Sequence, residues 1–98
     1  MRLITTKRIN AFIENHPQSG EQLSLIITTF KKSFFENVNQ VKSHFPKVSV
    51  LKNDRIVIDV HGKKYRLVMQ INYKIQVAYV RFIGTHAEYD KIDANTVK

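Results

Sequence analysis

The stretch Lys63–Asp90, KKYRLVMQINYKIQVAYVRFIGTHAEYD, decides the fold. Residues 65–72 alternate apolar and polar side chains, whereas residues 75–83 are almost continuously apolar. Alternation with a period of two is typical of a strand with one buried face, and a short apolar run fits a strand buried on both faces. The stretch therefore predicts a β-hairpin, and Gly84 is expected to end its second strand.

The length of the hairpin loop determines which side chains face each other. A loop of two or four residues centred on Tyr73 and Lys74 would place Arg66 directly opposite Arg81 on one face of the sheet. Like charges in such positions repel, so the pair would be expected to face a bound anion. A loop of three residues would instead turn Arg81 towards the apolar face. An alternative role for either arginine is an ion pair with Asp59, Glu88 or Asp90.

Three helices are predicted before Pro46, because apolar side chains recur there with helical spacing. The first ends before Pro17, since the residue before a proline avoids the α conformation. The second is expected to begin at Ser19, whose spacing from Gln22 suggests a capping box. Its buried stripe is predicted to consist of Leu23, Ile26, Ile27, Phe30 and Phe34.

The third helix is expected to begin at Asn37 and to end before Pro46. After this proline the apolar period changes to two, which predicts strands at residues 48–50 and 56–60 around a polar turn. Residues 1–5 are expected to form an edge strand, and residues 87–92 a short terminal helix or turn. The order predicts one α+β domain over residues 1–98, with N-terminal helices packed on one face of a small antiparallel β-sheet.

The composition suggests a polyanion-binding protein. Lys and Arg number 16 against 8 acids, a net charge of +8 on 98 residues. The excess is largest in residues 47–86, which carry eight basic and two acidic side chains. Such clustering on the predicted sheet favours nucleic acid as a ligand. The alternatives are a generally solvated basic surface and a patch that matches an acidic protein.

Several other classes of protein are excluded or disfavoured by the sequence. Cysteine is absent, which excludes disulfides and thiolate chemistry. No apolar run is long enough for a membrane span and the N-terminus has no signal-peptide pattern, so we expect a cytoplasmic protein with no membrane contact. The histidines lack metal-ligand spacing and there is no glycine-rich phosphate loop. No metal and no cofactor are therefore predicted.

Two residues after the hairpin have side chains suited to chemistry on RNA. His86 has an imidazole, which transfers protons near neutral pH. Tyr89 has a hydroxyl group and a ring on which a base can stack. Near Arg66 and Arg81 on the predicted sheet, these two residues form a candidate site.

The segment YRLVMQINYKIQVAYVRFIGTHAEYDKID, residues 65–93, resembles the HigB family of bacterial toxins in the RelE-like superfamily. The most specific parts are YRL at residues 65–67 and RFIGTHAEYD at residues 81–90. The similarity extends to the opening MRLITTKRI and to residues 45–67. The GTH element at residues 84–86 also resembles the closing strand of YafQ-type toxins, where the histidine takes part in cleavage.

The resemblance implies the toxin of a type II toxin–antitoxin pair, a metal-independent endoribonuclease that cleaves mRNA on the translating ribosome. It implies a HigA-like helix-turn-helix antitoxin as partner, with operator DNA contacted only through that antitoxin. By position, Arg66 would clamp the scissile phosphate, His86 would act as acid or base, and Tyr89 would orient or stack. The basic side chains expected to contact RNA are Arg81, Lys63, Lys64, Lys47, Lys52 and Arg55.

Composition alone supports RNA binding and not cleavage. The main alternative is therefore a non-catalytic basic module that binds RNA or the ribosome. A third hypothesis is a domain that binds an acidic protein and has lost catalysis.

Overall fold

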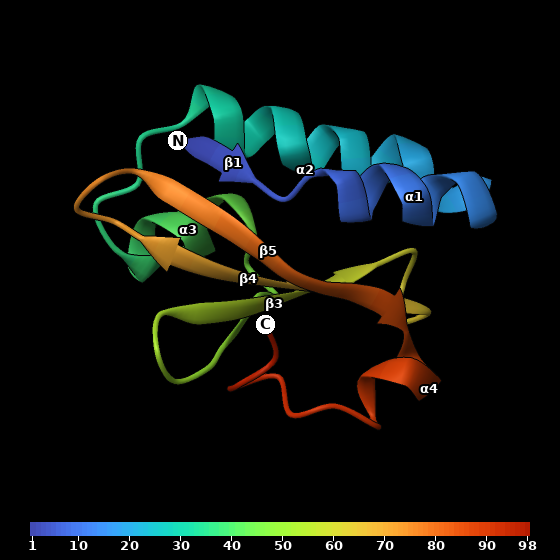
Figure 1. The fold of residues 1–98 in the computed structure, drawn as a ribbon. Coiled ribbons are helices and arrows are strands. Elements are labelled where there is room, and N and C mark those ends of the chain that lie inside the picture. Colours follow the sequence, from blue (N-terminus) through green and yellow to red (C-terminus); the bar gives the residue numbers. More distant parts are fainter.

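The computed structural model describes residues 1–98 and contains a five-stranded sheet in the order β1-β5-β4-β3-β2 (Figure 1). The strands are β1 (Arg2–Ile4), β2 (Ser49–Val50), β3 (Arg55–Val60), β4 (Tyr65–Asn72) and β5 (Val77–Thr85). The helices are α1 (Lys7–Asn15), α2 (Gly20–Lys32), α3 (Val38–His44) and α4 (His86–Tyr89), with a 3-10 turn at Pro17–Ser19. The α+β prediction is confirmed. The sheet is mixed rather than purely antiparallel, because β1 pairs in parallel with β5.

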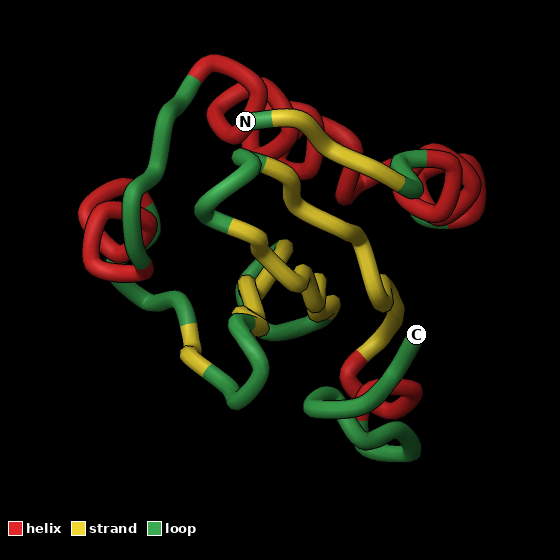
Figure 2. The backbone as a smooth tube through the Cα atoms, turned by 60° about the vertical axis from the view of Figure 1, so that its left-hand side comes forward, coloured by secondary structure: helices red, strands yellow, loops and turns green.

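The main core lies between the helices and one face of the sheet. Figures 1 and 2 show α1 and α2 side by side on this face. From the sheet, Leu67, Met69 and Ile71 on β4 are fully buried against Leu23 and Phe30 of α2 and its neighbours. Full burial of an apolar side chain of this size contributes about 1.5–3 kcal/mol, so this alternating set anchors the sheet to the helices.

The predicted helix ends are confirmed at the prolines, but one predicted cap is wrong. Ser19 is buried, and its hydroxyl donates to the carbonyl oxygen of His16 at 2.7 Å instead of capping α2. Gln22 reaches across to the sheet, where its Oε1 accepts from the His61 N–H at 2.7 Å. At α3 the predicted start is correct, because the Asn37 side chain accepts from the Gln40 N–H.

The predicted buried stripe of α2 is wrong at its last member. The helix ends at Lys32, and Ser33 is already extended. Phe34 therefore points away and is 68% exposed, whereas Phe35 is 1% exposed with its ring centroid 5.3 Å from that of Phe30. Because the chain is extended after Lys32, Phe35 rather than Phe34 faces the core.

The hairpin register differs from the prediction in two ways. The loop has four residues, 73–76, but it is centred one residue later than expected, so Asn72 pairs with Val77. A β-bulge follows, because Met69 pairs with Val80 and Val68 with Phe82, which leaves Arg81 unpaired. The bulge shifts the remaining register by one residue.

Arg66 consequently pairs with Gly84, and the predicted placement of Arg66 directly opposite Arg81 is wrong. The strand also continues past Gly84 to Thr85. Residue 75, which was predicted to begin this strand, lies in the loop and is exposed.

The face of the sheet away from α1 and α2, here called the outer face, is partly covered. Figures 1 and 2 show that the chain after β5 returns beneath the sheet. There Ala94 is buried against Val57 and Val68, and Phe82, Tyr89 and Ile92 pack around them. The outer face is therefore not the open basic surface that the charge count suggested. No helix is long and apolar enough to cross a membrane.

We predict that the two neighbouring phenylalanines differ sharply in their effect on stability. Phe35→Ala should lower the free energy of unfolding by about 3–5 kcal/mol, because it leaves a cavity beside Phe30. Phe34→Ala should change it by less than about 0.5 kcal/mol, because that ring is mostly in water. Urea denaturation of both variants measures the difference, and equal losses would contradict the placement of the end of α2.

Candidate active site

Arg66 and Tyr89 come together on the outer face. Asp59 lies directly opposite Arg66 in the β3–β4 register, with its Oδ1 3.3 Å from the Arg66 Nε. The Arg66 guanidinium carbon is 4.8 Å from the centroid of the Tyr89 ring. This arrangement combines an ion pair with a cation–π contact, and it fixes the plane of the guanidinium.

The Arg66 guanidinium keeps capacity to bind an anion. Its side chain is 24% exposed, and its contact with Asp59 is made through Nε rather than through the Nη atoms. The Nε contact with Asp59 is a Coulombic contact without hydrogen-bond alignment. An ion pair that is partly exposed in this way contributes at most about 1 kcal/mol, so a phosphate can compete for the free edge of the guanidinium. The predicted alternative, an ion pair of Arg66 with Asp59, is therefore present, but it involves only the Nε of the guanidinium.

Helix α4 carries His86 and Tyr89, and a capping box defines its start. The Thr85 hydroxyl accepts from the Glu88 N–H at 3.2 Å, and the Glu88 Oε1 accepts from the Thr85 N–H at 2.8 Å. The backbone hydrogen bond and then the hydroxyl lower the pKa of Glu88. The T-x-x-E pattern at residues 85–88 is the sequence signal for this cap. The predicted helix at residues 87–92 missed it.

His86 is held by a carboxylate from the same segment. Its Nδ1 lies 3.1 Å from Oδ2 of Asp90, and the imidazole is 49% exposed. Its backbone N–H donates to the carbonyl oxygen of Lys64, which ties α4 to the start of β4. A carboxylate at Nδ1 favours the tautomer with the proton on that nitrogen and leaves Nε2 free for proton transfer.

A hollow of about 640 Å³ lies beside His86 at the end of the sheet. We call it the histidine hollow, and it is lined by His16, His61, Lys63, Lys64, Tyr65, Thr85, His86 and Ala87. The predicted contacts Lys63 and Lys64 are therefore close to His86. The prediction missed His16, which is distant in sequence from the hairpin and belongs to no motif, whereas His61 is part of the basic run at residues 61–64 that was predicted as a phosphate contact. No group of three or more His, Asp or Glu side chains has the arrangement of a metal site.

Arg55 is not available to RNA, contrary to the prediction. It is 6% exposed and donates to the carbonyl oxygens of Ala94 and Val97. Burial, followed by the nearby charge of Arg81, lowers its pKa, while Asp93 acts in the opposite direction. Its role is structural, because its hydrogen bonds hold the terminal segment on the outer face.

Arg81 also lies apart from Arg66. Its Nε donates to Oε1 of Gln70 at 3.1 Å, and its guanidinium lies over the Tyr79 ring at 4.8 Å. The Val68–Phe82 pair separates these residues from Arg66 along the hairpin. The two arginines share the outer face but do not form one clamp.

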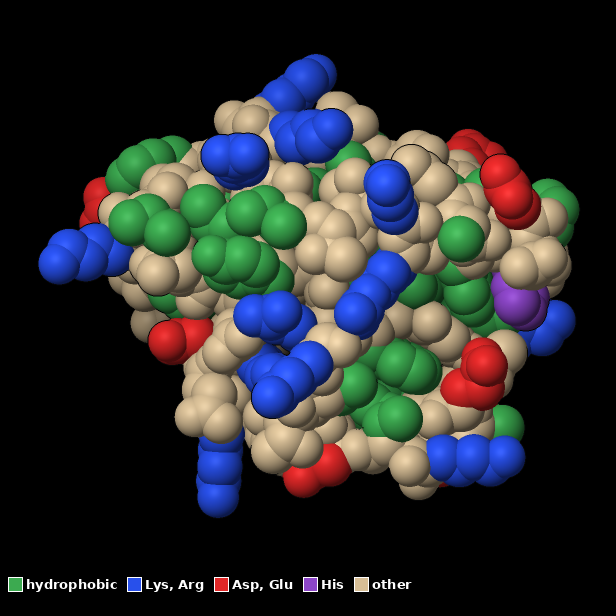
Figure 3. Space-filling model, viewed as in Figure 1, with side chains coloured by type: hydrophobic (Ala, Val, Ile, Leu, Met, Phe, Trp, Pro, Cys, Tyr) green, Lys and Arg blue, Asp and Glu red, His purple; other side chains and the backbone are tan.

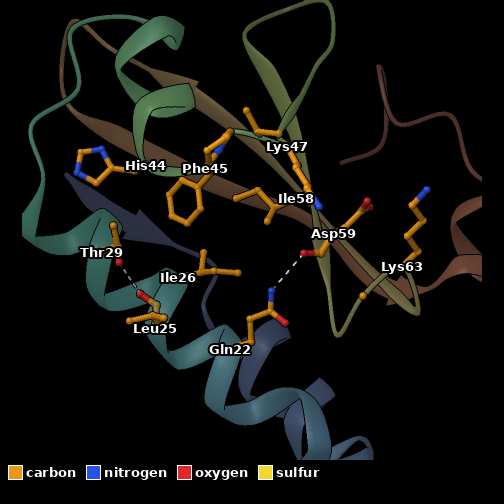
Figure 4. Close-up of a pocket in the computed structure, with 13 residues that line it drawn as sticks. Gln22, Leu25, Ile26, Thr29, His44, Phe45, Lys47, Ile58, Asp59 and Lys63 are labelled. Atoms are coloured by element: carbon orange, nitrogen blue, oxygen red, sulfur yellow. Dashed lines mark hydrogen bonds between the residues drawn. The ribbon is translucent and has the colours of Figure 1, made fainter.

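The remaining predicted contacts are dispersed. Lys52 lies in the turn before β3, where its N–H donates to the Asn95 side chain. Lys47 lines a different, mainly apolar groove of about 710 Å³ between α2 and β3, which Lys63 also borders (Figure 4). On the face that Figure 3 shows, Lys and Arg side chains lie over helices and strands alike. Of the predicted basic residues, only Lys63 and Lys64 join His86.

Comparison with known proteins identifies the family of this chain. Residues 19–92 match the model of the HigB_toxin family, described as the RelE-like toxic component of a toxin–antitoxin system. The chain belongs to the HigB toxin family. It is 32% identical over 92 residues to the mRNA interferase toxin HigB of Escherichia coli K12, covering 92% of this chain and 88% of the relative. The mRNA interferase HigB of Shigella flexneri has the same identity and coverage.

The matched segment includes all three predicted catalytic residues of this HigB-family chain. Arg66, His86 and Tyr89 lie within residues 19–92, whereas His16 precedes them. A further relative, the mRNA interferase HigB of Escherichia coli O6:H1, is 27% identical over 94 residues, covering 94% of this chain and 91% of its own length. The predicted family is thus confirmed, while the roles of individual site residues remain predictions.

We predict that the capping box makes stability depend on acid pH. Thr85→Ala should lower the free energy of unfolding at pH 7 by about 1 kcal/mol. Because the folded state lowers the pKa of Glu88, the stabilisation is present above the ordinary value of 4.5 and is lost as pH falls through the lower folded value. Glu88→Gln removes the titrating carboxylate, so its difference from wild type should shrink as pH falls below 4.5, whereas Thr85→Ala keeps the backbone hydrogen bond to Glu88 and most of the pH dependence.

Urea denaturation at neutral and acid pH measures both effects. Thr28→Ala on the exposed side of α2 is the matched control, and it should show no such pH dependence. An unchanged difference between wild type and Glu88→Gln at all pH values would contradict the role of the Glu88 carboxylate.

Proposed function

We propose that this HigB-family protein is an endoribonuclease that cleaves mRNA at the end of the sheet where Arg66, Tyr89 and His86 lie. The observation that carries the proposal is the contact of Arg66 with Tyr89, on the same short helix as a carboxylate-bound His86. The curated relatives are named mRNA interferases, and they cover most of the chain. The positions of Arg66, Tyr89 and His86 and the chemistry of their side chains therefore support a single RNA-cleaving site.

The proposed reaction is a transesterification that needs only groups of this site. The 2′-hydroxyl attacks the adjacent phosphorus, and the 5′-oxygen of the next nucleotide leaves. The free edge of the Arg66 guanidinium stabilises the growing charge on the phosphoryl oxygens. His86 transfers a proton, and the Tyr89 ring keeps the guanidinium in place while offering a surface to a base.

The setting of the reaction is also a proposal. The net charge of +8 suits binding to mRNA on the translating ribosome, which is itself a polyanion. We therefore place the activity in the cytoplasm. As the family is that of toxic components of toxin–antitoxin systems, the partner is an antitoxin, and we propose a HigA-like helix-turn-helix protein that alone contacts operator DNA.

A non-catalytic RNA- or ribosome-binding module is the second candidate. The dispersed basic side chains favour it, because they would support salt-dependent binding without any clamp at one phosphate. This candidate predicts growth arrest without cut RNA.

We predict that Arg66→Ala and His86→Ala each reduce mRNA cleavage by about 100-fold or more, because each removes a group that acts in the transition state. Primer extension on mRNA from cells that express each variant measures new 5′ ends. Arg2→Ala, which removes an exposed arginine on β1, is the matched control and should cleave like wild type.

Circular dichroism of the purified variants tests for a retained fold. If wild type arrests growth without new RNA ends, the binding module is the correct function. If wild type cleaves and both variants cleave equally well, the site is elsewhere.

A further inference from the structure

Two histidines in the histidine hollow share one pattern of hydrogen bonding. The Nδ1 of His86 lies 3.1 Å from Oδ2 of Asp90, and the Nδ1 of His16 lies 3.3 Å from the carbonyl oxygen of Phe12. Neither Nε2 has a hydrogen-bond partner in the protein. An oxygen acceptor at Nδ1 fixes a proton there, so each ring keeps Nε2 for exchange with a ligand.

The His16 ring is held rigidly. It stacks on Phe12 with ring centroids 4.2 Å apart and planes at 13°, and it meets the edge of Tyr65 at 5.1 Å. Tyr65 is itself buried, and its hydroxyl accepts from Gln18. His16 also follows the last turn of α1, where backbone carbonyls accommodate a positive charge. These contacts with Phe12 and Tyr65 fix the orientation of the His16 imidazole.

The rest of the hollow suits a phosphate. Lys63 and Lys64 come from the turn before β4, and His61 lies nearby with its ring 6.0 Å from that of Tyr65. Point charges from lysine and donors from imidazole attract a phosphodiester without fixing its orientation. The hollow thus offers two oriented imidazoles to a substrate that its lysines bind.

We propose that His16 and His86 form the acid–base pair of the RNA-cleaving reaction, an inference that rests on the function proposed above. The His86 Nε2 takes the proton of the 2′-hydroxyl, and Asp90 stabilises the resulting imidazolium. The O2′–P bond forms and the P–O5′ bond breaks. The His16 imidazolium donates its Nε2 proton to O5′, so the products are a 2′,3′-cyclic phosphate and a 5′-hydroxyl end.

This assignment gives each imidazole a different task. The carboxylate of Asp90 compensates a proton gained by His86, which suits a base. The neutral carbonyl of Phe12 holds the Nδ1–H of His16 while the other nitrogen gives up its proton, which suits an acid. The charged and titratable groups around the pair are Tyr65, His61, Lys63, Lys64, Glu88 and Asp90.

The test compares His16→Phe with His44→Phe. Phenylalanine at residue 16 keeps a ring to stack on Phe12 but cannot transfer a proton. His44 is the matched control, because its Nδ1 also lies near a helical carbonyl, that of Gln40 at 3.4 Å, and its ring contacts Phe35, away from the histidine hollow. The substrate is a short labelled mRNA bound to ribosomes, and the rate is measured under saturating enzyme from about pH 5 to about pH 9.

Wild type and His44→Phe should give a bell-shaped profile, as expected for one acid and one base. His16→Phe should be slower by about 100-fold or more and should lose the limb that reports the acid. A substrate with a bridging 5′-sulfur should restore most of its rate, because a thiolate leaves without a proton. The same substrate should not rescue His86→Ala.

Each remaining result has a definite meaning. If wild type cleaves with these ends and His16→Phe keeps the rate and the bell shape, the pairing is wrong and the proposed function stands. A slow His16→Phe that keeps both limbs and gains nothing from the sulfur substrate also overturns it, since His16 is then structural. If wild type leaves the RNA uncut, the proposed function fails and the pair fails with it.

Discussion

Burial of β4 on both faces is the constraint on which the rest of the structure depends. Its helix side holds Leu67, Met69 and Ile71, and its outer side holds Val68 under the returning terminal segment. The register of a strand between two layers is strictly determined, because a slip of one residue would turn each side chain towards the opposite layer. Two of its polar side chains, Arg66 and Gln70, contact Asp59 and Arg81 respectively.

Much of the fold follows from local patterns in the sequence. Prolines and the Asn37 cap mark helix ends through local sterics and hydrogen bonding, so these predictions are confirmed. The errors arise where tertiary packing decides. The exchange of Phe34 and Phe35 depends on the backbone after α2, and the bulge at Arg81 depends on the pairing of two strands. Neither leaves a periodic signal in the sequence.

The candidate site was predictable in part, where its residues lie close together in the sequence. Arg66, Tyr89 and His86 lie within one continuous segment of sequence, and the structure places Arg66 against Tyr89, which shares a short helix with His86. The predictions based on charge alone were less accurate, because the charge of a residue does not show whether it is buried. Arg55 is buried, and its hydrogen bond to Ala94 holds the terminal segment. His16 comes from a helix on the other layer, and only the tertiary fold brings it to the histidine hollow.

The bulge at Arg81 divides the second hairpin strand into two parts with separate partners. The part before it pairs with β1, which leads into α1 and hence to His16. The part after it pairs with the start of β4 and continues into α4, which carries His86. A residue gained or lost at the bulge would shift the phase of one part relative to the other, and with it the side chains that face each layer. The bulge therefore determines how the two layers that border the hollow meet, because its single extra residue keeps both parts of β5 paired with β4.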